Sequence, residues 1–241
     1  MDLSANQNEI TPEFETFQLQ YRVKSQTWNI VTKAGNYWAV GAASAIQASS
    51  KEDKSGDHFK LKWNEDGTCS IFIANPSRAE EENLKAICNR KSGQLYCGSS
   101  NPVCFYVMFQ NRTFLNLRAN NGSSFVGLKS SGGGKLESNK TSPDSVLVEY
   151  INSESNRLDL NFNCCHLKMT SNFKYLTIIE ANMVACDASS RESAQQWIIE
   201  LRTENCIAIR TFETGLYLNL TNQGSIVVNN CHPKDATLWE F

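Results

Sequence analysis

Apolar and polar residues alternate in short runs along this chain, and turns rich in Gly, Asn and Ser separate the runs. Examples are FQLQY at 17–21, FKLKW at 59–63 and WIIEL at 197–201. Alternation of this kind, with aromatic and β-branched residues and a turn about every ten residues, is typical of half-buried β-strands. No long segment has a helical period, and SRAEEENLKAI at 77–87 comes nearest. The pattern predicts an all-β protein.

The strand pattern recurs at intervals of roughly forty residues. Similar strands follow polar loops, and their anchor residues are separated by 42, 46, 41, 51 and 41 positions: Phe17, Phe59, Phe105, Val146, Trp197 and Leu238. Before most anchors the chain reads strand, Gly/Asn turn, strand, small-residue turn, strand. This predicts repeats of four short strands, as in propellers and β-trefoils. The brief third strand, followed by small residues in QASS and CDASS, favours tandem β-trefoils.

The repeats also predict a domain organisation. Residues 22–150 contain three whole repeats and should form a closed first β-trefoil, which leaves no free sheet edge. Residues 151–241 contain two clear repeats, so the second lobe is expected to be irregular or incomplete. We expect residues 1–21 and 151–164 to pack on that second lobe and replace its missing third. The alternative is that residues 1–13 form a disordered tail.

Composition narrows the function. The chain has 241 residues, 41% of them hydrophobic, and a net charge of −2, which supports real cores and argues against a nucleic-acid partner. No apolar window is long enough to predict a membrane span, and the N-terminus does not resemble a secretory signal. The nine cysteines are odd in number and include no CxxC motif. We therefore expect reduced, packed thiols in a cytoplasmic protein.

Candidate catalytic and metal-binding motifs are weak. Cys164, Cys165 and His166 are adjacent in a predicted strand, so their side chains alternate between its two faces. The glycine-rich loop at 127–140 is not a phosphate-binding motif, because Lys129 stands where that motif needs Gly. The sequence predicts no enzyme, no cofactor and no metal site. Gln195 and Trp197 match the Gln-x-Trp motif of ricin-type lectins, in which these residues are structural.

Three stretches, at 17–63, 115–150 and 172–201, resemble fascin repeats. Their shared features are an aromatic strand such as NYWAV, a short strand ending in Ala-Ser, and a polar loop that leads into an aromatic-led strand. The resemblance extends over about residues 17–241. It implies β-trefoils and, in the best-known members, a cytoplasmic and cytoskeletal protein that bundles actin filaments. Fascins have four β-trefoils, whereas this chain has material for at most two.

The resemblance implies one candidate actin-contacting segment at 46–59. It contains Lys51 and Lys54, with Ser49 and Ser50 as candidate phosphorylation sites that would cancel the positive charge. Acidic residues at 52 and 53 interrupt the lysines, so a solvated hairpin loop is the alternative.

The second candidate is the glycine-rich loop, whose positive charges come from Lys129, Lys135 and Lys140. A flexible hairpin turn is the alternative for this loop. Together the two segments predict F-actin as partner. Bundling would need two filament sites per particle, which a homodimer would supply. The other functional hypotheses are a carbohydrate-binding β-trefoil and a protein-interaction scaffold with no role in actin binding.

Overall fold

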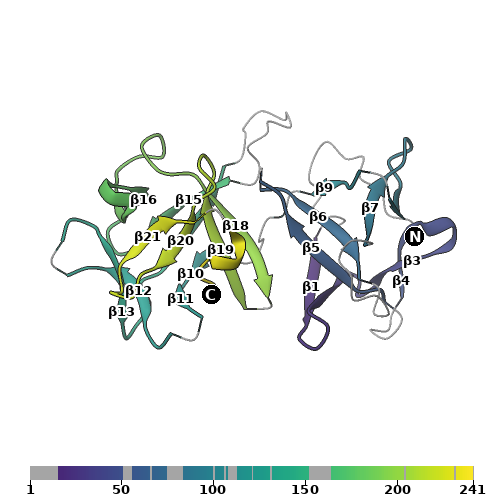
Figure 1. Ribbon diagram of the computed structural model, residues 1–241, viewed down its shortest axis with the longest axis horizontal. Helices are drawn as coiled ribbons and strands as arrows, with labels where there is room; N and C mark the ends of the chain where they lie inside the picture. The colour runs from purple at the N-terminus through teal and green to yellow at the C-terminus, as the bar shows by residue number, and fades with distance from the viewer. Residues whose placement is uncertain are drawn as a thin grey trace. The chain divides into compact units, whose positions relative to one another are not determined.

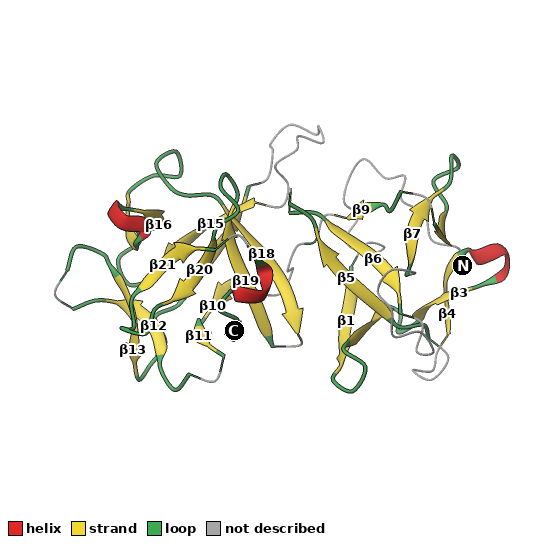
Figure 2. Cartoon of the chain, in the orientation of Figure 1, coloured by secondary structure: helices red, strands yellow, loops and turns green. Residues whose placement is uncertain are grey.

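The computed structural model describes residues 16–50, 56–65, 67–74, 84–99, 101–105, 107, 113–120, 122–130, 132–151, 164–203, 205–230 and 232–240. Strands predominate in this part of the chain, and its helices are 3-10 turns of three residues (Figure 2). The all-β prediction is therefore confirmed. None of these short turns has the length or the apolar character of a membrane-spanning helix. The chain forms two compact units that divide after residue 107, apart from residues 65–67, which group with the second unit.

Unit 1 is a network of antiparallel strands (Figure 1). Strands β1, β2, β5, β6 and β9 pair in a row, while β3–β4 and β7–β8 form hairpins. The bounds are β1 (Phe17–Arg22), β2 (Thr27–Thr32), β3 (Tyr37–Val40), β4 (Ile46–Ser50), β5 (Phe59–Trp63), β6 (Cys69–Ile73), β7 (Lys85–Asn89), β8 (Leu95–Gly98) and β9 (Cys104–Phe105). Alternate apolar residues of these strands, such as Ile30, Phe59 and Ile87, form one buried core.

Unit 2 contains a closed ring of strands. The pairing runs β10–β14–β15–β18–β19–β22–β11, and the ring closes because β10 and β11 are two halves of the segment 113–120. The ring strands are β10 (Phe114–Leu115), β11 (Arg118–Ala119), β14 (Val146–Tyr150), β15 (Cys164–Met169), β18 (Trp197–Thr203), β19 (Cys206–Thr211) and β22 (Trp239–Glu240).

Three hairpins cap the ring of unit 2. They are formed by β12 (Phe125–Leu128) with β13 (Leu136–Lys140), β16 (Tyr175–Ile178) with β17 (Val184–Ala188), and β20 (Tyr217–Leu220) with β21 (Ile226–Asn229). Each hairpin bridges to the other two, through the pairs Lys135–Ala185, Glu137–Ser225 and Met183–Val227. A closed six-position ring capped by three mutually contacting hairpins is the arrangement of a β-trefoil.

The same local structure recurs in both units. A register shift occurs at the start of the second strand of a repeat, between Tyr37 and Trp38 in β3 and between Tyr175 and Leu176 in β16. The hydroxyl of the tyrosine at this position then donates to the preceding ring strand. Three such bonds are Tyr37 to Gln20 at 3.2 Å, Tyr175 to Glu149 at 3.0 Å and Tyr217 to Glu200 at 3.0 Å. These bonds identify β1, β14 and β18 as equivalent strands, each the last of its repeat.

The grouping of repeats differs from the expected division at residue 150. Strand β14 pairs with β15 over five residues, and Ala119 of β11 pairs with Trp239 of β22, so the repeat at 113–150 belongs to unit 2. Unit 2 is consequently the unit with three repeats. The alternating pattern predicts each repeat but not its partners, because every repeat offers a similar apolar face.

The N-terminal strand also lies in a different place from the one expected. All six residues of β1 pair with β2, so residues 17–22 contribute to unit 1 and not to the second lobe. Residues 1–15 and 152–163, the rest of the segments expected to complete the second lobe, lie outside the described residues.

Candidate functional site

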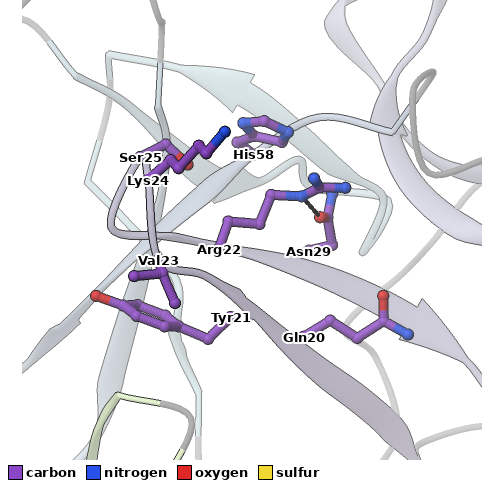
Figure 3. Close-up of a pocket in the computed structure, with 8 residues that line it drawn as sticks. All are labelled: Gln20, Tyr21, Arg22, Val23, Lys24, Ser25, Asn29 and His58. Atoms are coloured by element: carbon purple, nitrogen blue, oxygen red, sulfur yellow. Dashed lines mark hydrogen bonds between the residues drawn. The ribbon is translucent and has the colours of Figure 1, made fainter.

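A shallow hollow of about 540 Å³ lies in unit 1 where β1 turns into β2 (Figure 3). It is lined by Gln20, Tyr21, Arg22, Val23, Lys24, Ser25, Asn29 and His58. The turn is tight: Gln26 adopts a left-handed conformation with φ of 51°, and the hydroxyls of Ser25 and Thr27 lie 2.6 Å apart. This local structure brings the positive side chains at the end of β1 to one edge of the hollow.

Hydrogen bonds fix the side chain of Arg22 at the edge of the hollow. The Nε of Arg22 donates to Oδ1 of Asn29 at 2.5 Å, and Nδ2 of Asn29 donates to the carbonyl of Asp57 at 3.2 Å. Asn29 is buried in β2, so the guanidinium is anchored to the centre of the sheet. The amine of Lys24 points toward the ring of His58 in Figure 3. The pairing of β2 with both β1 and β5 brings these residues together.

The electrostatics of the hollow favour anions. Burial lowers the pKa of His58, the nearby charge of Arg22 lowers it further, and Asp57 partly offsets both effects. None of the lining residues carries a carboxylate. The carboxylate of Asp57 accepts a hydrogen bond of 2.6 Å from the backbone N–H of Val40 at the end of β3. A concave surface with positive groups and no acidic lining residue attracts anionic partners.

Sequence reasoning missed this hollow. Arg22 and Lys24 are separated from His58 by more than thirty positions, and the residues around His58 indicated only a surface residue. The signal that could have indicated this site was the pair of positive residues, Arg22 and Lys24, at the end of an amphipathic strand. Their approach to His58 depends on strand pairing, which alternation alone does not specify.

The predicted segment at 46–59 is only partly described. Ser49 is exposed near the end of β4, and Ser50 ends that strand. Lys51, Lys54 and the side chain of Ser50 lie outside the described residues. Their proposed roles in actin contact and phosphorylation therefore stay predictions.

The glycine-rich loop between β12 and β13 brings Lys129 and Lys135 together. The N–H of Lys129 donates to the carbonyl of Lys135 at 2.8 Å, and the N–H of Lys135 donates to Gly132 at 3.0 Å. Gly134 anchors the loop to β17 by accepting a 2.7 Å bond from the N–H of Cys186. These bonds hold the described part of the loop, so the backbone at the two lysines has a fixed position.

Lys140 does not join the other two lysines. It lies at the end of β13, and its amine forms an ion pair of 3.3 Å with Glu137, three residues earlier in the same strand. Lys129 is exposed and Lys135 half-buried, whereas the charge of Lys140 is shared with a carboxylate. The role of these three lysines in actin contact stays a prediction.

The cysteine and histidine motif lies in the interior of unit 2. Cys164, Cys165 and His166 are all buried in β15, and burial raises the pKa of the Cys164 thiol to about 12. Burial lowers the pKa of His166, whose Nδ1 lies 3.3 Å from the carbonyl of Gln195. Among the described residues no group of His, Cys, Asp and Glu could hold a metal ion. Trp197, of the Gln-x-Trp motif, is fully buried, in keeping with a structural role.

Comparison with known proteins supports the resemblance recognised from the repeats. Residues 1–78 match the fascin domain family. Over the whole chain, fascin-2 of Bos taurus is 22% identical across 246 aligned residues, and fascin-2 of Mus musculus is 22% identical across 244. The chain covers 44% of the length of each, so it spans less than half of these curated relatives.

Similarity to solved structures is weak. A GH43 β-1,3-galactosidase aligns with 94% of this chain and 54% of its own, at a TM-score of 0.42 and 10% identity. The hemolytic lectin CEL-III aligns with 90% of this chain and 56% of its own, at a TM-score of 0.30 and 10% identity. Likeness at this level carries no argument about function.

Proposed function

We propose that this chain is a non-catalytic, cytoplasmic, fascin-like protein that binds actin filaments. The observation that carries the proposal is the match of residues 1–78 to the fascin domain family, together with whole-chain similarity to two fascin-2 proteins. The best-known fascins bundle actin filaments through several surface patches, and the resemblance implies a similar activity for this chain.

Two surfaces suit an acidic filament. In unit 1 the hollow presents Arg22 and Lys24, and in unit 2 the glycine-rich loop presents Lys129 and Lys135. Both surfaces lie on tight, hydrogen-bonded hairpin turns, so little conformational entropy is lost when they bind. Positive patches facing acidic grooves contribute association rate and orientation, and their contribution weakens as salt increases.

Bundling makes a stronger demand than binding, because one particle must hold two filaments. One filament site in each unit would meet this demand, and so would a homodimer with one site per chain. Cosedimentation with F-actin separates the cases. Pelleting at low speed indicates bundling, pelleting at high speed alone indicates binding without bundling, and no pelleting at either speed contradicts the proposal.

The contribution of the glycine-rich loop can be tested by charge reversal. We expect the double variant Lys129→Glu, Lys135→Glu to weaken high-speed pelleting at least about fivefold at low salt, because two favourable contacts become repulsive.

Lys234→Glu is the control for charge, and it reverses one lysine where the double variant reverses two. It makes the same kind of change at an exposed position of unit 2, in the 3-10 turn at Pro233–Asp235. A loss of binding free energy in the control at least half as large as in the double variant would mean that only net charge matters and would remove the loop from the filament site.

A further inference from the structure

The turn between β15 and β16 in unit 2 places Phe173 in a conformation that disfavours a bulky residue. Its φ is 56°, in the left-handed region, and it is the largest of the described non-glycine residues with positive φ. Two hydrogen bonds fix the backbone there. The N–H of Phe173 donates to the carbonyl of Met169 at 3.0 Å, and the N–H of Met169 donates to the carbonyl of Lys174 at 2.9 Å. A large side chain in this conformation strains the turn.

Other repeats have glycine at the same place. Phe173 lies two residues before the tyrosine that begins β16, and the corresponding residues before β3 and β20 are Gly35 and Gly215, with φ of 80° and 68°. The turn at Gly215 has the same two hydrogen bonds: its N–H donates to Thr211 at 3.2 Å, and Thr211 donates to Leu216 at 2.9 Å. Glycine adopts this conformation without strain. The fold of the repeat therefore does not require a phenyl ring at residue 173.

The ring of Phe173 is also exposed. Its accessible fraction is 72%, so burial within the chain does not compensate for the strained backbone. A position that violates both the local conformational rule and the hydrophobic rule is the kind of position where function is expected.

Phe173 lies on a turn that contacts the neighbourhood of the glycine-rich loop. The side-chain amide of Asn172 donates to the carbonyl of Cys186 at 3.2 Å, and the N–H of Cys186 donates to the carbonyl of Gly134 at 2.7 Å. Lys135 follows Gly134 directly. The exposed ring and the lysines of the loop therefore belong to neighbouring turns of unit 2.

The charge next to Phe173 is balanced within the chain. The amine of Lys174 forms an ion pair of 3.0 Å with Asp187, and the N–H of Lys174 donates to the side chain of Asn172 at 3.0 Å. A partner can cover the ring beside this pair at a smaller desolvation cost than beside a single charge. The turn is also held by its own hydrogen bonds, so little conformational freedom is lost on binding.

We infer that Phe173 is the apolar anchor of a filament-binding surface in unit 2, with Lys129 and Lys135 beside it. The ring enters an apolar pocket on the filament, and the lysines meet acidic groups around that pocket. Charged contacts mainly give association rate and orientation, whereas buried aromatic anchors supply much of the affinity of an interface. This inference rests on the proposed function and names the residue that the two lysines alone do not replace.

The variant Phe173→Gly tests the inference, because it installs the residue that the equivalent turns already have. We expect the midpoint of thermal unfolding to rise by about 2 °C as the strain is relieved. The apparent affinity for F-actin in high-speed pelleting should fall at least about tenfold, since an apolar contact is lost. The loss should be equal at about 50 mM and about 200 mM KCl, whereas the loss in Lys129→Glu, Lys135→Glu should shrink with salt.

Phe114→Ala is the control for removal of an exposed ring. Phe114 lies in β10 of the same unit and is 54% exposed. Its replacement should leave the apparent affinity within about twofold of the unaltered chain, because rings outside the anchor contribute little. Equal losses in Phe114→Ala and Phe173→Gly would overturn the inference.

The remaining outcomes separate the inference from the proposed function. If the unaltered chain pellets with F-actin and Phe173→Gly pellets equally well, the inference is wrong and the proposed function stands. If the unaltered chain does not pellet, both are wrong. A lower midpoint of unfolding in Phe173→Gly would show that the ring packs within the chain. A dimer that Phe173→Gly converts to a monomer in sedimentation velocity would show that a second copy covers the ring, and either result would overturn the inference.

Discussion

At the scale of single residues, buried polar side chains form hydrogen bonds that connect successive repeats. Glu200 is buried in β18 and accepts hydrogen bonds from Arg210 at 2.7 Å and from Tyr217 at 3.0 Å, with Arg202 as a further partner. The equivalent Glu149 lies nearer the surface. Burial raises the pKa of Glu149, but the hydrogen bonds from Tyr175 and Arg191 outweigh that effect and leave its pKa below the ordinary value. The glutamate at this position of the repeat, Glu149 or Glu200, therefore accepts a hydrogen bond from a tyrosine of the next repeat in both cases.

Gly134 offers a direct test of the glycine-rich loop. Its φ is +76°, and a Cβ there would lie 2.5 Å from the carbonyl oxygen of Cys186. We expect Gly134→Ala to lower the free energy of unfolding by about 1–3 kcal/mol, since both backbone strain and a steric clash oppose it. Chemical denaturation measures the change.

Gly132→Ala is the matched control for Gly134→Ala. No heavy atom lies within 4 Å of a Cβ at Gly132, and its φ is outside the left-handed region. We expect its stability to change by no more than about 0.5 kcal/mol. Similar losses in the two variants would show that the contact with β17 does not restrain the loop.

The buried thiols predict a loss of stability in alkali. Burial raises the pKa of Cys164 and of Cys186 to about 12 from an ordinary value of 9.0. Above pH 9 the unfolded chain releases these protons while the folded chain retains them. Stability should therefore be complete below pH 9 and decline as pH rises toward 12, by up to about 1.4 kcal/mol per pH unit for each thiol.

Urea denaturation under reducing conditions between pH 7 and 10 measures this slope. Cys104 is exposed, so Cys104→Ser should leave the slope unchanged, whereas Cys186→Ala should reduce it. A free energy of unfolding that stays constant from pH 8 to pH 10 would show that these thiols ionise equally in the folded and unfolded chains.

At the scale of elements, two-residue strands close the ring of unit 2. Trp239 of β22 pairs with Ile207 of β19 and with Ala119 of β11, and its indole N–H donates to the carbonyl of Leu218 at 3.1 Å. Glu240 adds an ion pair with Arg118. A short strand can close a ring because its neighbours on both sides hold it.

We expect Trp239→Ala to cost unit 2 about 3–5 kcal/mol, since it removes a fully buried aromatic and one hydrogen bond. Phe105→Ala, at the equivalent position of β9 in unit 1, should cost roughly half as much, because that side chain is only partly buried. Thermal unfolding followed by circular dichroism measures both variants. Equal losses would mean that Phe105 is covered as completely as Trp239.

At the scale of the whole molecule, the two units differ in how their repeats are completed. Unit 2 closes three repeats into a ring, and in the described part of unit 1 two repeats pair with β1, the final strand of another.

Several features were predictable because they depend on local order in the sequence. Alternation predicted strands at 59–63 and 197–201, and their anchors Phe59 and Trp197 are fully buried. The last anchor was misplaced by one position: Trp239 is buried and Leu238 only partly so, because pairing with β19 and β11 sets the facing of β22. The ion pair of Lys140 with Glu137 was not predicted, because alternation does not show which charged side chains meet.

The sequence by itself determined the all-β class, the recurring four-strand unit and the resemblance to fascins, since all three follow from side-chain order within about forty residues. Only the tertiary structure decided which repeats share a ring, that β1 belongs to unit 1, and that Arg22 and Lys24 lie beside His58. These outcomes depend on pairing between strands far apart in the chain. Similar apolar faces make many such pairings compatible with one sequence pattern, and the packing of the whole unit selects among them.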